Sequence, residues 1–400
     1  MINKETIIVK KKTFILTFIC ILLLTFIGCS NNERINTNTN ISAAKSSIES
    51  VQEGLNNSSD STHRFKKNLG ENLYVDAIVD APKIESVSVL KAESVKFDPE
   101  TLLNIFFKSK NIKGKKQGVG VLYKDDEKNL MILNDKTFFE FFTPLKSNIQ
   151  GIINTSDTGN LNKFKLENLD FMSKQEAISR AKEFISKLNI TTYGQPKAYS
   201  IDYKTMQQEQ EKSLKEGLQG FVDLGKVKLK EKWTKDDEFY YIQFRVDING
   251  IPCDNIGYTQ IPSGIPVSGS QIEIIISKKG IELFTPLGTI YKKVGTVGDG
   301  KSVITIDKAL ETVKKRYESV ILQNEVVIKD ISLIYTPKLI NPKIDSKTGA
   351  IDLKQLNLVP CWLFTINQKG KNTKNTNIAE IDKVPNTYIR VNAISGEEIL

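Results

Sequence analysis

Two stretches of this chain repeat the same order of helix and strand at a constant spacing. Ala177 corresponds to Ala309 in a predicted helix, and Tyr203 corresponds to Tyr335 in a predicted strand; both pairs are 132 residues apart. Each stretch then continues with an aromatic strand and closes with two strands joined by a glycine turn, at 239–246 and 272–284 in the first and at 361–366 and 388–400 in the second. This equal spacing predicts a duplicated helix–strand–strand–hairpin module.

The predicted helices carry their own start signals. Ser173 and Glu176 form a capping-box pattern before an apolar stripe, and Asp98 with Pro99 marks an earlier helix. A helix over one face of an antiparallel sheet is the simplest architecture for each module, so the predicted fold class is α+β. We expect a signal peptide at 1–28, a lipidated, disordered tether at 29–64, an N-terminal α+β module at 65–150, and repeated modules at 165–292 and 300–400.

The N-terminus has the pattern of a bacterial lipoprotein signal. Lysines at 4 and 10–12 precede the uncharged apolar run Thr13–Ile27, which is shorter than the about 20 residues that span a bilayer. Gly28 then precedes Cys29, which we predict to be the lipid-attachment residue. The alternative is an uncleaved anchor helix. Both alternatives place residues 30–400 at the extracytoplasmic face of the cell membrane.

The predicted tether bears on the chemistry of the protein. Ser30–Thr62 is rich in Asn, Ser and Thr, and the chain's one histidine, His63, stands at its far end. A histidine in a solvated linker argues against histidine-dependent catalysis and metal sites. Removal of residues 1–28 lowers the net charge from +9 to +6. The remaining charges are interspersed, which favours mild attraction to an anionic membrane and predicts no binding of nucleic acid.

Residues Gly295–Ser302 satisfy the nucleotide-binding pattern G-x4-G-K-S. That chemistry needs the lysine and serine at the start of a helix, whereas the strand-like stretch 303–306 comes first and the next helix cap falls around Thr305–Asp307. We therefore expect a glycine-rich turn between two modules and no nucleotide ligand.

Other candidate side chains leave alternatives open. Cys253 and Cys361 are the thiols left in the mature chain, and they form either a disulfide or two buried free cysteines. The carboxylates Asp236, Asp237, Glu238, Asp345 and Asp352 fit solvated turns better than catalysis. The aromatic residues Trp233, Tyr240, Tyr241 and Trp362 line either a binding surface or the core. The polar insert after Tyr203 is either a solvent-facing helix or an interaction arm.

Several segments together resemble a family of uncharacterised Firmicute lipoproteins, the domain-of-unknown-function 6034 type. They are the lipobox, LYVDAIVDAP from Leu73, FDPETLLNIFF from Phe97, and the closing VPCWLF and YIRVNAISGEEIL. The repeated module also resembles PepSY-type domains, with the A-x-x-G-E turn at Ala393, Gly396 and Glu397. This resemblance implies a binding or inhibitory role rather than turnover.

The expected function is that of a membrane-anchored, non-catalytic lipoprotein that binds or regulates an extracytoplasmic protein. The alternative is a solute- or cell-wall-binding lipoprotein that uses its aromatic strands. We expect no enzyme activity, no catalytic residue, no cofactor and no metal. The N-terminal lipid would make the membrane a partner.

Overall fold

The structure is a computed structural model that describes residues 62–108, 111–149, 152–153, 158–225, 227–342, 356–368 and 386–400. The predicted signal peptide, Cys29 and nearly all of the predicted tether lie outside these ranges. In the described ranges, no helix combines the length and the apolar character needed to cross a membrane.

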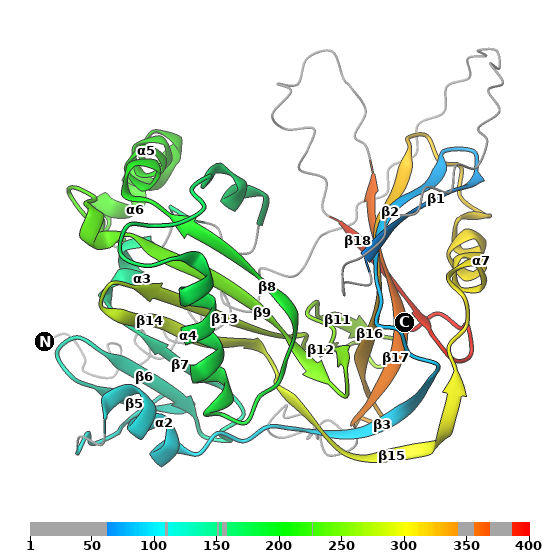
Figure 1. Cartoon of the computed structure of the whole chain (residues 1–400), viewed down its shortest axis with the longest axis horizontal. Helices are drawn as coiled ribbons and strands as arrows, with labels where there is room; N and C mark the ends of the chain where they lie inside the picture. Colours follow the sequence, from blue (N-terminus) through cyan, green and yellow to red (C-terminus); the bar gives the residue numbers. More distant parts are fainter. Residues whose placement is uncertain are drawn as a thin grey trace, which may run out of the picture. The chain divides into compact units, whose positions relative to one another are not determined.

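The first sheet, sheet 1, joins strands from both ends of the chain (Figure 1). In spatial order its main path is β1 (Thr62–Gly70), β2 (Leu73–Asp80), β16 (Val326–Leu339), β17 (Leu356–Gln368), β3 (Ser86–Ser94) and β15 (Tyr291–Ser302). Strand β18 (Thr387–Asn392) also pairs with β17. The β2–β16 pair is parallel and the other pairs are antiparallel.

The second sheet, sheet 2, is antiparallel and larger. In spatial order its main path is β10 (Ile251–Pro252), β9 (Phe239–Ile248), β13 (Ser270–Ser277), β14 (Gly280–Gly288), β7 (Phe139–Phe142), β6 (Asn129–Leu133), β5 (Gly120–Lys124) and β4 (Lys115–Gln117). Strand β8 (Thr192–Ile201) also pairs with β9. A separate hairpin is formed by β11 (Tyr258–Gln260) and β12 (Ile265–Val267).

Both faces of sheet 2 are covered, because side chains alternate along each strand. On the inner face, Tyr240, Ile242 and Phe244 of β9 join the main core with helices α2 (Pro99–Phe107) and α4 (Lys174–Ser186). On the outer face, Phe239 and Tyr241 join a second core with α3 (Pro144–Ile149) and the short 3-10 helix η2 (Thr158–Lys163). Helix α7 (Ile306–Tyr317) adds Ala309, Leu310 and Val313 to the main core.

The helix start signals read from the sequence are confirmed. Asp98 accepts a hydrogen bond from the Thr101 amide at 2.9 Å, and Ser173 accepts one from the Glu176 amide at 3.1 Å. Thr305 caps α7 by accepting from the Lys308 amide at 3.2 Å. These side chains satisfy amide groups that the first turn of a helix leaves without an internal partner. The helix positions were therefore encoded locally.

The prediction of an α+β fold made of repeated helix-on-sheet modules is wrong. The described residues are mostly β, with few helices, two large sheets of seven and nine strands and the separate β11–β12 hairpin. Strands of the segment expected to form its own N-terminal module are divided between the sheets: β2 and β3 pair with β16 and β17, and β7 pairs with β14. A separate module of three or four strands would leave backbone groups unpaired along its apolar edge strands. Strands β2, β3 and β7 pair with those edges instead.

The expectation that the tether extends to residue 64 is also corrected. Strand β1 begins at Thr62, and His63 lies opposite Val79 of β2. The side chain of His63 is exposed, and its backbone belongs to the edge strand of sheet 1.

Candidate functional site

The insert between β8 and β9 forms an arm on the outer face of sheet 2. We call residues 203–233 the arm. It consists of α5 (Tyr203–Ser213), a π-helical turn, η3 (Leu214–Leu218), α6 (Gln219–Asp223) and a return segment that leads to Trp233. Asp202 caps α5 by accepting a hydrogen bond from the Thr205 amide at 2.9 Å.

The base of the arm is packed and not solvent-facing. Helix α5 buries Met206 and Gln210, and the return segment buries Trp233. Met206 and Trp233 belong to the same core cluster as Tyr241 of β9. The prediction of a purely solvent-facing helix is therefore wrong for α5. Although the sequence of α5 is mostly polar, one face of the helix, with Met206 and Gln210, is buried.

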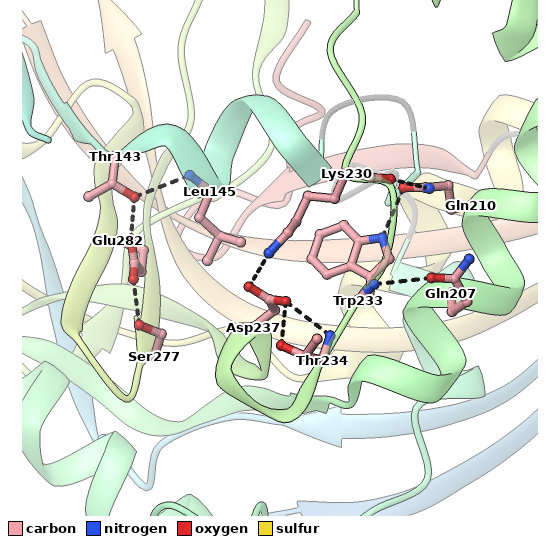
Figure 2. A network of polar contacts seen from close by, with 10 residues as sticks. All are labelled: Thr143, Leu145, Gln207, Gln210, Lys230, Trp233, Thr234, Asp237, Ser277 and Glu282. Atoms are coloured by element: carbon pink, nitrogen blue, oxygen red, sulfur yellow. Dashed lines mark hydrogen bonds and ion pairs between the residues drawn. The ribbon is translucent and has the colours of Figure 1, made fainter.

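A polar network fixes this base (Figure 2). The indole Nε1 of Trp233 donates to Gln210 Oε1 at 2.9 Å, and Gln210 Nε2 donates to the carbonyl of Lys230 at 2.7 Å. The backbone amide of Trp233 donates to Gln207 Oε1 at 3.1 Å. These contacts satisfy both the buried indole and the buried amide, which would otherwise be costly to desolvate.

The network continues to a carboxylate that sequence reasoning assigned to a solvated turn. Lys230 Nζ forms an ion pair with Asp237, whose Oδ2 also accepts from the Thr234 amide at 3.0 Å and hydroxyl at 2.9 Å (Figure 2). Burial alone would raise the pKa of Asp237, but Lys230 and Thr234 hold it below its usual value. Asp237 is thus a structural acceptor at the base of the arm.

The tip of the arm is apolar and exposed. Phe221 is 53% exposed and Leu224 is 68% exposed, and they are three residues apart at the end of α6. Gly217, with φ of 119°, bends the chain inside the preceding π-helical turn. Three-residue spacing places both side chains on one side of the helix end. The arm therefore holds two large apolar groups in solvent on a fixed base.

Two further buried carboxylates lie on sheet 2, and sequence reasoning missed them. Glu282 accepts hydrogen bonds from the hydroxyls of Thr143 and Ser277 (Figure 2). Glu273 accepts from the Tyr241 hydroxyl and from Gln243 Nε2, and burial raises the pKa of Glu273. The sequence pattern that could have indicated them is a single acidic residue within an otherwise apolar strand: Glu273 in IEIII and Glu282 in IELF.

The described members of the other predicted carboxylates have different environments. Asp236 is exposed and pairs with Lys278 at 3.1 Å. Glu238 is buried, and burial raises its pKa. Asp345 and Asp352 lie outside the described residues. Within the described ranges, no cluster of three or more His, Cys, Asp or Glu side chains is placed to hold a metal ion.

The four aromatic residues considered for a binding surface belong to the core. Trp233, Tyr240, Tyr241 and Trp362 are all buried. Tyr240 donates its hydroxyl proton to the carbonyl of Met172 at 2.7 Å, and Trp362 Nε1 donates to the carbonyl of Ile304 at 2.9 Å. A binding surface made of these aromatic side chains is therefore excluded.

Cys253 and Cys361 are both free and buried, so the structure has the second of the two alternatives, a pair of buried free cysteines. The two residues belong to different core clusters: Cys253 packs in the main core, and Cys361 packs in a smaller one with Ile334 and Val359. Burial raises the pKa of the Cys253 thiol, and it raises the pKa of the Cys361 thiol to about 12. Both thiols are therefore un-ionised near neutral pH.

The segment Gly295–Ser302 lies within β15, where Lys301 is opposite Val87 of β3. It belongs to an edge strand that is bulged between Val297 and Lys301, where Gly298 has a φ of 69°, and it is not a turn between two modules. Helix α7 begins only at Ile306, after the cap Thr305, so Lys301 and Ser302 do not start a helix. This arrangement differs from the loop-to-helix geometry of a phosphate-binding P-loop.

Comparisons with known proteins show the fold and no activity. No family model and no curated protein matches the chain. The chain is similar to the crystal structure of an uncharacterized protein from Eubacterium rectale ATCC 33656, with a TM-score of 0.54 and 15% sequence identity. The match covers 84% of this chain and 93% of that one. At this identity, the similarity is one of fold alone.

Proposed function

We propose that this protein is a non-catalytic lipoprotein, anchored at the extracytoplasmic face of the membrane through Cys29, that binds a protein partner through the tip of its arm. The observation that carries this proposal is the exposure of Phe221 and Leu224 on a helix whose base is fixed. Neighbouring exposed apolar side chains are a feature of interaction sites, and burying them against a partner removes apolar surface from water.

The fixed base supports binding in a second way. A loose loop would lose conformational entropy when it docks, and this loss weakens association. The contacts of Trp233 with Gln210 and Gln207 already order the base of the arm in the free protein. The tip is thus presented in a defined position before a partner arrives.

The proposed anchor explains why such a partner would be another surface protein. The lipobox ending at Cys29 predicts attachment to the outer leaflet of the cell membrane, and the polar stretch Ser30–Asp60 separates that lipid from the folded region. Metabolic labelling with a clickable fatty acid tests the anchor, because Cys29→Ala is expected to abolish label that the wild type carries.

Affinity purification from membranes of the source organism tests the binding role. We expect a reproducible partner with the wild type and about a tenfold or greater loss with Phe221→Ser combined with Leu224→Ser, because each side chain contributes roughly 1.5–3 kcal/mol when buried. The matched control is Val320→Ser with Ile321→Ser, which removes an exposed apolar pair elsewhere. Equal recovery by wild type and arm variant, or equal loss in the control, would contradict the proposal.

A further inference from the structure

A cavity of about 160 Å³ lies where β3 and β15 meet the turn between β9 and β10. It shares no residue with the arm. Its polar lining consists of Ser86, Ser88, Asn249, Lys293, Thr296 and Tyr335, and its apolar lining consists of Ile84, Val87, Leu90 and Ile251.

The walls of this cavity are fixed by backbone features. The pairing of β15 with β3 shifts register between Lys293 and Gly295, next to two of the lining residues. On the opposite wall, Asn249 and Gly250 adopt positive φ values of 56° and 80° in the tight turn before β10. Tyr335 donates its hydroxyl proton to the carbonyl of Ser88 at 3.1 Å, which ties β16 to β3. The cavity is thus formed by four separate chain segments.

The charges of the lining select for an anion. Lys293 is its one charged residue, and no carboxylate is among the lining residues. Among the described residues, Lys293 makes no ion pair, whereas the adjacent Lys292 pairs with Glu93 at 2.8 Å. The hydroxyls of Ser86, Ser88 and Thr296 add donors beside an aliphatic wall. An ammonium group with hydroxyl donors and apolar surface is complementary to a small carboxylate with a short apolar part.

We propose that this cavity binds a small monocarboxylate. Its carboxylate lies at Lys293 and accepts a hydrogen bond from the Thr296 hydroxyl, and its apolar part lies against Leu90, which is opposite Thr296, and against Ile251. The cavity is partly open to solvent, and its volume of about 160 Å³ accommodates a short-chain acid or the end of a small peptide. A free short-chain acid and the C-terminus of a small peptide both carry the carboxylate that the cavity would bind.

Isothermal titration calorimetry on the full mature chain in detergent tests this proposal and separates the two sources. Butyrate is the probe for a free acid, alanyl-alanine is the probe for a peptide carboxylate, and alanyl-alanine amide lacks the carboxylate. We expect saturable binding of at least one carboxylate probe, and binding of the amide weaker by about tenfold or more, the size of a lost charge-assisted hydrogen bond.

Substitutions at two adjacent lysines supply the matched controls. Lys293→Met is expected to weaken binding by about tenfold or more, Lys293→Arg to retain it, and Lys292→Met to bind like the wild type. Native circular dichroism of each variant checks folding, and the Arg variant keeps the test valid if the Met variant unfolds. No saturable binding of either carboxylate up to about 10 mM, equal binding of the amide, or an equal loss in Lys292→Met would overturn the proposal.

Discussion

Arg390 Nε donates to Asp254 Oδ2 at 2.6 Å, although 136 residues separate the two side chains and both are buried. The Arg390 Nη2 also donates to the carbonyl of Ile256 at 2.8 Å, and the ring of Tyr258 lies 4.8 Å from its guanidinium carbon. Arg390 belongs to β18 of sheet 1, whereas Asp254 follows β10 of sheet 2. The pair therefore ties the C-terminal strand β18 to the loop between β10 and β11.

Removal of one partner of this pair is expected to be strongly destabilising. Arg390→Met leaves the Asp254 carboxylate buried without a cation, which costs about 3–5 kcal/mol in comparable buried pairs. Urea unfolding at neutral pH measures the change. Lys308→Met is the control, because it breaks the exposed pair with Glu311 and is expected to change the free energy of unfolding little. Similar small effects of both substitutions would show that the buried pair is not a determinant of stability.

The contact between Gln210 and Trp233 is expected to hold the arm in place. Gln210→Leu removes the acceptor of the buried indole N–H, a loss of about 1–3 kcal/mol, and frees the segment at Lys230. Hydrogen exchange over residues 203–233 should become faster in this variant. Gln208→Leu, at an exposed position of the same helix, should leave the exchange unchanged. Unchanged exchange in the Gln210 variant would mean that the network does not order the arm.

Glu273 is expected to give a measurable pH dependence of stability. Because burial raises its pKa in the folded state, the folded protein binds more protons than the unfolded chain above the unfolded value of about 4.3. This carboxyl therefore makes the wild type lose stability as pH rises from that value through the folded pKa. Glu273→Gln has no ionisable group there, so its stability relative to the wild type should improve over this range.

Urea unfolding of both proteins between about pH 4 and pH 8 provides the comparison. Glu93→Gln serves as the control, because Glu93 is exposed in its pair with Lys292. Parallel curves for the wild type and Glu273→Gln would contradict the assignment of a raised pKa to this side chain.

Both cysteines of the folded region should be protected thiols. In the chain from Ser30 onward, Cys253 and Cys361 are the remaining cysteines. Because both are buried and un-ionised, we expect negligible reaction with Ellman's reagent in the native state and two equivalents of reaction after denaturation without reductant. The absence of reaction in the denatured state would instead reveal a disulfide.

Local signals in the sequence predicted the helices but not the sheets. The caps at Ser173 and Thr305 are read from a few neighbouring residues, and the structure confirms them. The parallel pairing of Leu73 with Val326 joins distant parts of the chain, and no local pattern specifies it. The duplicated spacing predicted two equivalent modules, and this prediction is wrong: Tyr203 begins helix α5, whereas Tyr335 lies within β16. The strands β8 and β16 belong to different sheets, and the spacing contains no information on that pairing.

The candidate site was predictable only in outline. The insert after Tyr203 was recognised as helical, and an interaction arm was one of its two interpretations. Its buried face consists of Met206 and Gln210, and a glutamine in a core gives no hydrophobic signal in the sequence. Conversely, Phe221 and Leu224 are apolar residues that a sequence pattern assigns to the interior, whereas the fold leaves them exposed. The packing of the arm on sheet 2 determines that Met206 and Gln210 are buried and that Phe221 and Leu224 are exposed.

Site-specific photocrosslinking in living cells tests the proposed binding role most directly. A benzoylphenylalanine placed at position 221 samples the tip of the arm, and one at position 321 samples an even more exposed apolar position after α7. We predict a discrete adduct with one surface protein from position 221, and its absence from position 321 and from position 221 of the Cys29→Ala chain. No adduct from position 221, or the same adduct from position 321, would contradict an arm that recognises a partner.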